Sequence, residues 1–156
     1  MKRLGPESFD VCVEMMLNAN PWNQLYFTEE QCQTDLHNPQ IMVDAAFNNE
    51  SVLGFIATMA HGLETEPMIV YLCVHENHRS QGIGSALIAH FESTLFPDAD
   101  NLYMFVSDIN PDAIRLYERL GYARIGELPD FNLVGQTEYL YRKSRRPRQQ
   151  RFAKID

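Results

Sequence analysis

The segment from Met68 to Ile88 limits the possible folds of this chain more than any other part of the sequence. An apolar stretch, MIVYLCV at residues 68–74, is followed by a short polar turn and then by RSQGIGSALI at residues 79–88. The first stretch predicts a buried strand and the last a helix, so Gly82 and Gly84 lie where a strand gives way to a helix. At such a junction free backbone N–H groups and the positive helix end face one point, and glycine lets the backbone approach a ligand closely. The segment therefore predicts a pyrophosphate-binding site, to which Arg79 adds a positive charge.

Two familiar nucleotide-binding loops do not match this segment. A P-loop needs Gly-Lys followed by Ser or Thr, and none occurs here. A dinucleotide-binding loop needs a third glycine where this chain has Leu87. The phosphate-binding loop is therefore of another kind.

The remaining sequence predicts an α/β (α+β) fold in a single domain. A chain of 156 residues that is 45% hydrophobic has the size of one compact domain. Apolar spacing, a capping box at Thr28 and Gln31, and turn residues mark the helices, while β-forming residues between turns mark the strands. The expected helices cover residues 6–18, 28–36, 82–96 and 110–121, and the expected strands cover residues 1–4, 40–47, 51–60, 66–74, 101–106, 122–127 and 136–143.

A second motif follows the first after one predicted strand. Residues 110–122 read NPDAIRLYERLGY, in which Asn, Pro and Asp begin a helix and Gly121 ends it. Together with Arg79-x-x-Gly82-x-Gly84 after an apolar strand, this segment resembles the acyl-CoA-binding region of GNAT N-acetyltransferases. The resemblance covers residues 1 to about 143. It implies a mixed, mostly antiparallel sheet of six or seven strands flanked by about four helices, with residues 1–143 as the domain. The basic tail of residues 144–156 is outside the resemblance and, because it has no apolar period, is expected to be mobile.

The same resemblance assigns roles to individual residues. Acetyl-CoA would be the co-substrate, and its acetyl group would pass directly to a primary amine in a ternary complex. The strand edge at Leu72, Cys73 and Val74 would bind the pantetheine arm, at a bulge where the strand separates from its neighbour. Asn110 and Ala113 would contact the arm from the other side. The pyrophosphate would be bound by Arg79 and by the backbone amides of Gln81, Gly82, Ile83, Gly84, Ser85 and Ala86.

Amide formation from a thioester needs a neutral amine, a stabilised oxyanion and a protonated thiol. An alkylammonium group has a pKa near ~10, so a base or a chain of waters must take its proton at neutral pH. The N–H of Val74 is the predicted oxyanion donor, and Tyr117, whose hydroxyl in the family reaches the thioester sulfur, is the predicted general acid. Spacing alone would make Tyr117 a core residue and Asn110 only a helix cap.

The general base has several candidates. Many relatives carry a glutamate on the strand before the glycine-rich turn, at a position that counting back from Arg79 matches to Met68. Glu66 lies two residues earlier on the same strand face and is the first candidate. Glu64, His61 and a chain of ordered waters are the alternatives.

The charge distribution bears on the acceptor. The net charge is −8, but residues 142–156 carry +6 and the remainder therefore carries −14. An acidic body attracts cations, which favours a cationic amine, and it equally serves solubility. In relatives the region of Trp22, Tyr26 and Phe27 forms part of the acceptor pocket. The sequence leaves open whether the acceptor is a small amine, an antibiotic or a peptide.

Other functions remain alternatives at this stage. The missing glutamate at Met68 leaves open an acyl-CoA-binding regulator without turnover. The basic tail could bind nucleic acid or an acidic protein surface, although the acidic body opposes the former. Cys12, Cys32 and Cys73 match no metal or disulfide pattern, so no metal is expected, and an acetyl-Cys73 intermediate is a minor alternative. No signal peptide or membrane span is predicted, which suggests a cytoplasmic protein, and a homodimer is left open.

Overall fold

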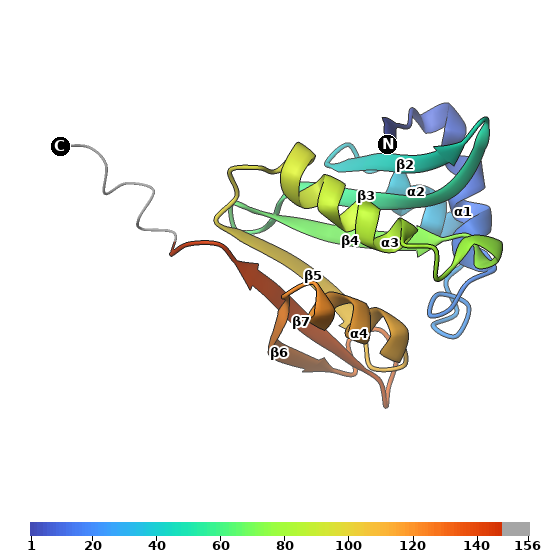
Figure 1. Ribbon diagram of the computed structural model, residues 1–156. Helices are drawn as coiled ribbons and strands as arrows, with labels where there is room; N and C mark the ends of the chain where they lie inside the picture. Colours follow the sequence, from blue (N-terminus) through green and yellow to red (C-terminus); the bar gives the residue numbers. More distant parts are fainter. Residues whose placement is uncertain (148–156) are drawn as a thin grey trace.

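The computed structural model describes residues 1–147, and within them seven strands form one mixed sheet (Figure 1). The spatial order of the strands is β1-β2-β3-β4-β5-β7-β6, and every neighbouring pair is antiparallel except β4 and β5. The strands are β1 (Lys2–Arg3), β2 (Ile41–Asn48), β3 (Ser51–Leu63), β4 (Glu66–Val74), β5 (Asn101–Ser107), β6 (Ala123–Pro129) and β7 (Thr137–Ser144). The α-helices are α1 (Phe9–Leu17), α2 (Glu29–Leu36), α3 (Ile83–His90) and α4 (Pro111–Arg119).

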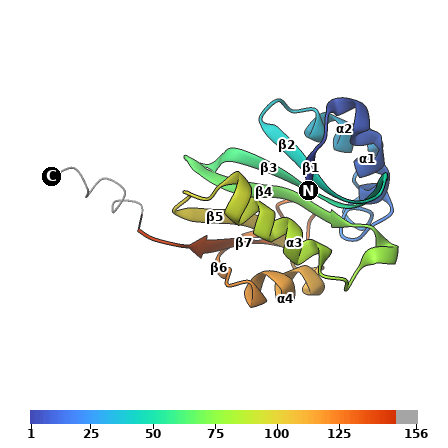
Figure 2. The ribbon, with the colours of Figure 1, turned by 45° about the horizontal axis from the view of Figure 1, so that its top comes forward.

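This architecture confirms the predicted fold class. Helices α1 and α2 cover one face of the sheet, and α3 and α4 cover the other (Figure 2). The predicted long helix over 82–96 divides into α3 and a following π-helical turn, Phe91–Leu95. The capping box predicted at Thr28 is present, with both reciprocal hydrogen bonds to Gln31.

Two apolar clusters, one on each face, hold the helices on the sheet. The first joins α1 and α2 to side chains such as Phe55 and Cys73, and the second joins α3 and α4 to side chains such as Ile56 and Met104. Helix α3 lies very close to the sheet at Gly54, where a Cβ atom would be 3.2 Å from Ile83 Cγ2 and 3.3 Å from Leu87 Cδ1 of the helix. Glycine at this position therefore lets the start of α3 rest on β3 and β4.

The sheet opens between β4 and β5. Their parallel pairing consists of Met68 with Tyr103 and Ile69 with Met104, and the strands then diverge (Figure 1). At the same point β4 carries a bulge, because Thr58 of β3 pairs with Ile69 and the adjacent Ala57 pairs with Tyr71. Val70 is the extra residue, and a bulge bends its strand and increases the local twist. The sequence-based expectation of a strand that separates at a bulge matches this geometry.

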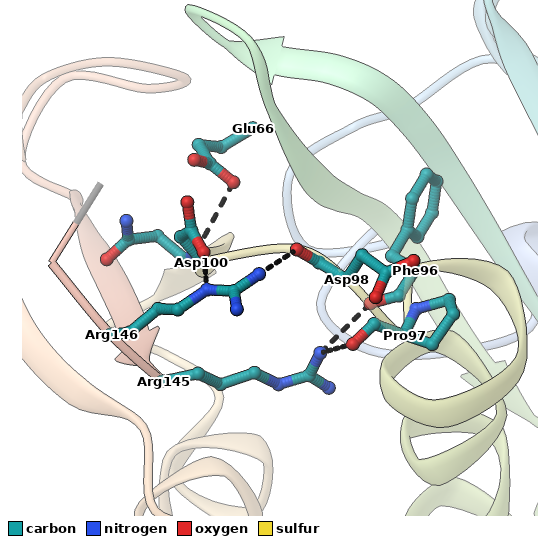
Figure 3. A network of polar contacts seen from close by, with 8 residues as sticks. Glu66, Phe96, Pro97, Asp98, Asp100, Arg145 and Arg146 are labelled. Atoms are coloured by element: carbon teal, nitrogen blue, oxygen red, sulfur yellow. Dashed lines mark hydrogen bonds and ion pairs between the residues drawn. The ribbon is translucent and has the colours of Figure 1, made fainter. Parts of the chain in front are cut away.

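Two arginines after β7 fasten the chain to the start of β5. Arg145 donates to the carbonyl oxygens of Glu92, Phe96 and Pro97 at 2.6, 2.9 and 3.1 Å. Arg146 forms an ion pair with the fully buried Asp100 and donates to the Asp98 carbonyl (Figure 3). These two members of the predicted tail are thus hydrogen-bonded to the domain. Residues 148–156, for which mobility was predicted, lie outside the described residues.

No helix in the described part of the chain combines the length and apolar character needed to cross a bilayer.

Candidate functional site

A cavity of about 970 Å³ lies where β4 and β5 diverge. Its walls come from the loop between α1 and α2, the ends of β4 and β5, the glycine-rich turn, α4, and the loop between β6 and β7. Most residues that the sequence assigned to the cofactor line this cavity. They are Leu72, Cys73, Val74, Arg79, Gly82, Ile83, Gly84, Ser85, Asn110, Ala113 and Tyr117. Gln81 and Ala86 belong to the same turn and helix but do not line the cavity.

The start of α3 presents free amides at one end of the cavity. Gly82 occupies the N-cap with φ of 81° and supplies no capping side chain. The Ala86 N–H donates to the Gly82 carbonyl at 2.9 Å, so the amides before Ala86 precede the first intrahelical bond. Gly84 faces α4, where a Cβ atom would be 3.3 Å from Leu116 Cδ2. This geometry suits an anionic group at the helix start.

The open edge of β4 offers a second set of backbone groups. The His75 N–H donates to the Leu53 carbonyl at 2.9 Å, so this residue pair is bonded across β3 and β4. Bonded and non-bonded pairs alternate in antiparallel sheets, so the backbone N–H and C=O groups of Leu72 and Val74 point away from β3. They face the divide between β4 and β5, where Arg79 Nε lies 3.5 Å from the Val74 oxygen. An extended ligand can therefore pair with β4 as an additional strand would.

Tyr117 reaches the cavity from α4. The helix begins as predicted, since the Asn110 side chain accepts the Ala113 N–H at 3.2 Å. The Tyr117 ring packs edge-on against Tyr122 at 6.2 Å and lies 6.5 Å from Tyr141. Burial raises the pKa of the Tyr117 hydroxyl well above its ordinary value. This hydroxyl is therefore held in its protonated form at neutral pH.

The other side of the cavity faces α1 and α2. Tyr71 and Cys73 of β4 belong to the apolar cluster on that face. Ser107 of β5 is paired with Glu138 of β7, and both line the cavity. The α3 start and the Glu138 carboxyl thus border one cavity that passes through the opening in the sheet.

Aromatic rings surround this second side. Trp22 and Phe27 line the cavity as predicted, with ring centres 6.2 and 6.4 Å from that of Tyr71. The Tyr71 hydroxyl donates to Asp35 at 2.5 Å, which ties β4 to α2. Tyr26, the third predicted residue, is 77% exposed and does not line the cavity.

Comparison with known proteins identifies the family. The sequence model of the acetyltransferase (GNAT) family matches residues 9–122, which is most of the chain. The chain belongs to the GNAT acetyltransferase family. It is accordingly an N-acetyltransferase, as the two sequence motifs predicted. No curated protein sequence matches it.

Solved structures share the GNAT fold at low sequence identity. The ribosomal-protein-S18-alanine N-acetyltransferase of Escherichia coli has a TM-score of 0.77 and 17% identity, covering 94% of this chain and 93% of its own. Arabidopsis thaliana NAA60 in complex with acetyl-CoA has a TM-score of 0.73 and 21% identity, covering 92% and 97%. An aminoglycoside 6′-N-acetyltransferase complexed with coenzyme A has a TM-score of 0.73 and 19% identity, covering 92% and 94%. These neighbours differ in acceptor, so the fold alone does not define the acceptor.

Glu66 lies away from the cavity of this GNAT enzyme. It begins β4, eight residues before Val74, or about 26 Å along a strand. Its carboxylate accepts the backbone N–H of Asn101 at 3.3 Å, next to Asp100 (Figure 3). The residues of β4 that line the cavity begin at Ile69, three positions after Glu66. Glu64 and His61 lie near the same distant turn and do not line the cavity either.

Cys73 lies in the cavity wall with its thiol turned into the core. The thiol is 3.7 Å from the Met15 carbonyl oxygen of α1. Burial raises its pKa from 9.0 to about 12, so thiolate is scarce at neutral pH. This environment disfavours an acetyl-Cys73 intermediate. Within residues 1–147 no group of three or more His, Cys, Asp or Glu side chains is arranged to hold a metal ion.

Sequence reasoning missed Glu138. This residue is 6% exposed, lines the cavity, and accepts a hydrogen bond from Asn132 Nδ2 at 2.9 Å. Burial raises the pKa of its carboxyl above the ordinary value, and the Asn132 hydrogen bond opposes that rise. The available signal was an acidic residue inside a predicted strand, beside Tyr139 and Tyr141 at alternate positions.

Proposed function

We propose that this GNAT enzyme transfers an acetyl group from acetyl-CoA directly to a primary amine that is positively charged in solution. One observation carries the proposal: a single cavity joins the free amides at the α3 start to the buried Glu138 carboxyl, with Tyr117 on its wall. Two substrates can therefore meet in the opening of the sheet from opposite faces.

The residues present suit acetyl-CoA at the α3 side. The amides of the glycine-rich turn and the Arg79 guanidinium would bind the pyrophosphate, and Gly82 leaves open space because a Cβ there would meet nothing within 4 Å. The outward groups of Leu72 and Val74 would hydrogen-bond the pantetheine amides. Asn110 and Ala113 would border the arm from the α4 side. Bound in this way, acetyl-CoA supplies the acetyl group as a thioester.

Tyr117 and Val74 carry the polar chemistry on this side. The Val74 N–H would donate to the thioester carbonyl oxygen as that oxygen gains negative charge. The Tyr117 hydroxyl would give its proton to the departing sulfur. Because its pKa is raised by burial, Tyr117 enters the reaction as the protonated acid that this role requires. Arg79 would have to leave the Val74 carbonyl, its present partner, to reach the pyrophosphate.

The acceptor side suits an ammonium group on an apolar body. Trp22, Phe27 and Tyr71 offer ring surface for a carbon skeleton, and a cation is attracted to aromatic faces. The overall charge of −8 adds a general attraction for cations. We therefore expect amines with an aromatic or alkyl body to be better acceptors than polyhydroxylated ones.

The test is steady-state release of CoA thiol from acetyl-CoA at pH 8 with 2-phenylethylamine, a polyamine, an aminoglycoside and a lysine peptide. Tyr117→Phe is expected to lower kcat at least tenfold with an unchanged Kd for acetyl-CoA. The matched control is Tyr122→Phe, which alters a buried tyrosine in contact with Tyr117 that does not line the cavity. Tight acetyl-CoA binding without turnover on any amine would favour the regulatory alternative.

A further inference from the structure

Glu138 is a buried carboxyl group that the fold does not neutralise. It is 6% exposed, and no lysine or arginine in the described part of the chain forms an ion pair with it. Burying an acid without a cationic partner is unfavourable for folding. Its position in the cavity wall therefore indicates a ligand that supplies the opposite charge.

A second observation indicates a ligand at the same place. The Ser107 hydroxyl is buried, lines the cavity beside Glu138, and as a hydrogen-bond donor to that carboxyl lowers its pKa. A hydroxyl that donates its one hydrogen to a carboxylate keeps its oxygen free to accept a hydrogen bond from a ligand in the cavity. Ser107 and Glu138 are partners in the β5–β7 ladder, so their side chains share a face. An ammonium group, with three N–H donors, can satisfy both.

Asn132 holds the carboxylate in place from the β6–β7 loop. Its side-chain N–H donates to Glu138 Oε1 at 2.9 Å. Phe131, the preceding residue, stacks on Phe105 of β5 at 5.9 Å, which fixes this part of the loop against the cavity wall. Asn132 itself is exposed, so the fold does not depend on its burial. Its contact with Glu138 therefore serves the orientation of the carboxylate.

On the basis of the proposed transferase function, we propose that Glu138 and Ser107 together bind the ammonium group of the acceptor. Glu138 takes the proton that must leave the nitrogen before the nitrogen attacks the thioester. Asn132 acts as a positioning residue. The neutral nitrogen then forms the C–N bond as the C–S bond of the thioester breaks. One of the three ammonium protons stays on the amide nitrogen. One passes through Glu138 to solvent, and one replaces, by way of solvent, the proton that Tyr117 gives to sulfur. The sum is an amide, CoA thiol and one released proton.

The surroundings of Glu138 fix the expected pH dependence. Burial raises its pKa, the hydrogen bonds from Asn132 and Ser107 oppose the rise, and the nearby Asp108 carboxylate adds to it. On the α1–α2 side the cavity is lined by the aromatic residues Trp22 and Phe27. The acidic limb of kcat/KM should therefore lie above the ordinary pKa of glutamate. Asn132→Ala removes one of the opposing hydrogen bonds and should move this limb to higher pH.

Turnover of 2-phenylethylamine by Glu138→Gln tests the proton transfer. A positioned general base raises the reaction rate by about 100-fold or more, so kcat/KM for the amine should fall by at least that factor. The acidic limb of the pH profile of kcat/KM should also disappear. The Kd for acetyl-CoA should stay within about twofold, because the change lies on the opposite side of the cavity. The matched control is Glu127→Gln, the same change at an exposed carboxylate of β6, which should leave all three quantities unchanged.

Amine binding gives a readout that does not need turnover. Trp22 is the one tryptophan of the sequence and lines the cavity, so its fluorescence can follow 2-phenylethylamine binding in the presence of CoA. Glu138→Gln should weaken the amine at least tenfold and leave neutral 2-phenylethanol unaffected. Equal amine affinity in the two proteins, or an unshifted acidic limb in Asn132→Ala, would overturn the Glu138 assignment. Amine binding that depends on Glu138 without turnover in the unaltered protein would overturn the transferase proposal alone.

Discussion

Gly82→Ala should weaken acetyl-CoA binding beyond its effect on stability. Gly82 has φ of 81° at the start of α3, and a Cβ there would meet nothing within 4 Å. The change therefore adds only the left-handed backbone strain of an L-residue, about 1–2 kcal/mol. For a protein of this size that lowers the midpoint of thermal unfolding by about 2–8 °C.

Gly135→Ala is the matched control for this change. Gly135 has φ of 86°, again with nothing within 4 Å of a Cβ, but it lies in the β6–β7 loop. Both variants should lose similar thermal stability. In Gly82→Ala, relaxation of the strained turn moves the backbone amides at the α3 start away from the position in which they would bind the pyrophosphate. Loss of one hydrogen bond to a charged group, about 1.5–3 kcal/mol, raises Kd by about 10- to 150-fold.

Isothermal titration of each variant with acetyl-CoA, without an amine, measures this difference. The Kd should rise in Gly82→Ala and stay within about twofold of the unaltered protein in Gly135→Ala. Equal affinities in both variants, at equal loss of stability, would refute the assignment of the α3 start to the pyrophosphate.

Three further predictions concern the acceptor wall, the C-terminal arginines and the cysteines. Phe27→Ala should raise the KM for 2-phenylethylamine severalfold, with acetyl-CoA affinity unchanged in titration, because Phe27 lines the cavity and packs on the α1–α2 face of the sheet. Arg146→Ala should lower the midpoint of thermal unfolding by leaving the buried Asp100 without its ion pair, whereas Arg142→Ala, at an exposed side chain of β7, should not. Burial raises the pKa of the Cys12 and Cys73 thiols from 9.0 to about 12. Protonated thiols therefore stabilise the fold fully below pH 9 and progressively less from about pH 9 to 12. The free energy of unfolding in urea should decline over this pH range, and the decline should be shallower in the double variant Cys12→Ala/Cys73→Ala. An equal slope of unfolding free energy against pH in the two proteins would contradict this.

The parts of the site that the sequence predicted are those defined by local backbone chemistry. The glycine-rich turn and the α4 start each depend on residues within a few positions of one another. A left-handed Gly82 and an Asn110 cap follow from side-chain sterics and hydrogen bonding alone. Both elements can therefore be predicted from local sequence, without knowledge of long-range contacts.

The base could not be predicted because it depends on how strands are arranged. Counting along β4 could not give the position of the Val70 bulge, where the sheet opens and which lies four residues after Glu66. Glu138 reaches the cavity only because β7 inserts between β5 and β6 and pairs Glu138 with Ser107. Tyr26 was likewise grouped with Trp22 by proximity in sequence, whereas the loop turns its side chain outward. Each of these outcomes is set by contacts between distant segments.

The most direct test of the account is whether CoA thiol and acetylated amine appear together. The full chain is incubated with acetyl-CoA and 2-phenylethylamine at pH 8, free thiol is followed with a thiol reagent, and the amide is quantified by mass spectrometry. The three cysteines of the protein are buried, so they should add little background. The account predicts thiol and amide in equal amounts, with release that requires the amine. Thiol release that is the same without amine, or the absence of acetyl-CoA binding, would contradict it.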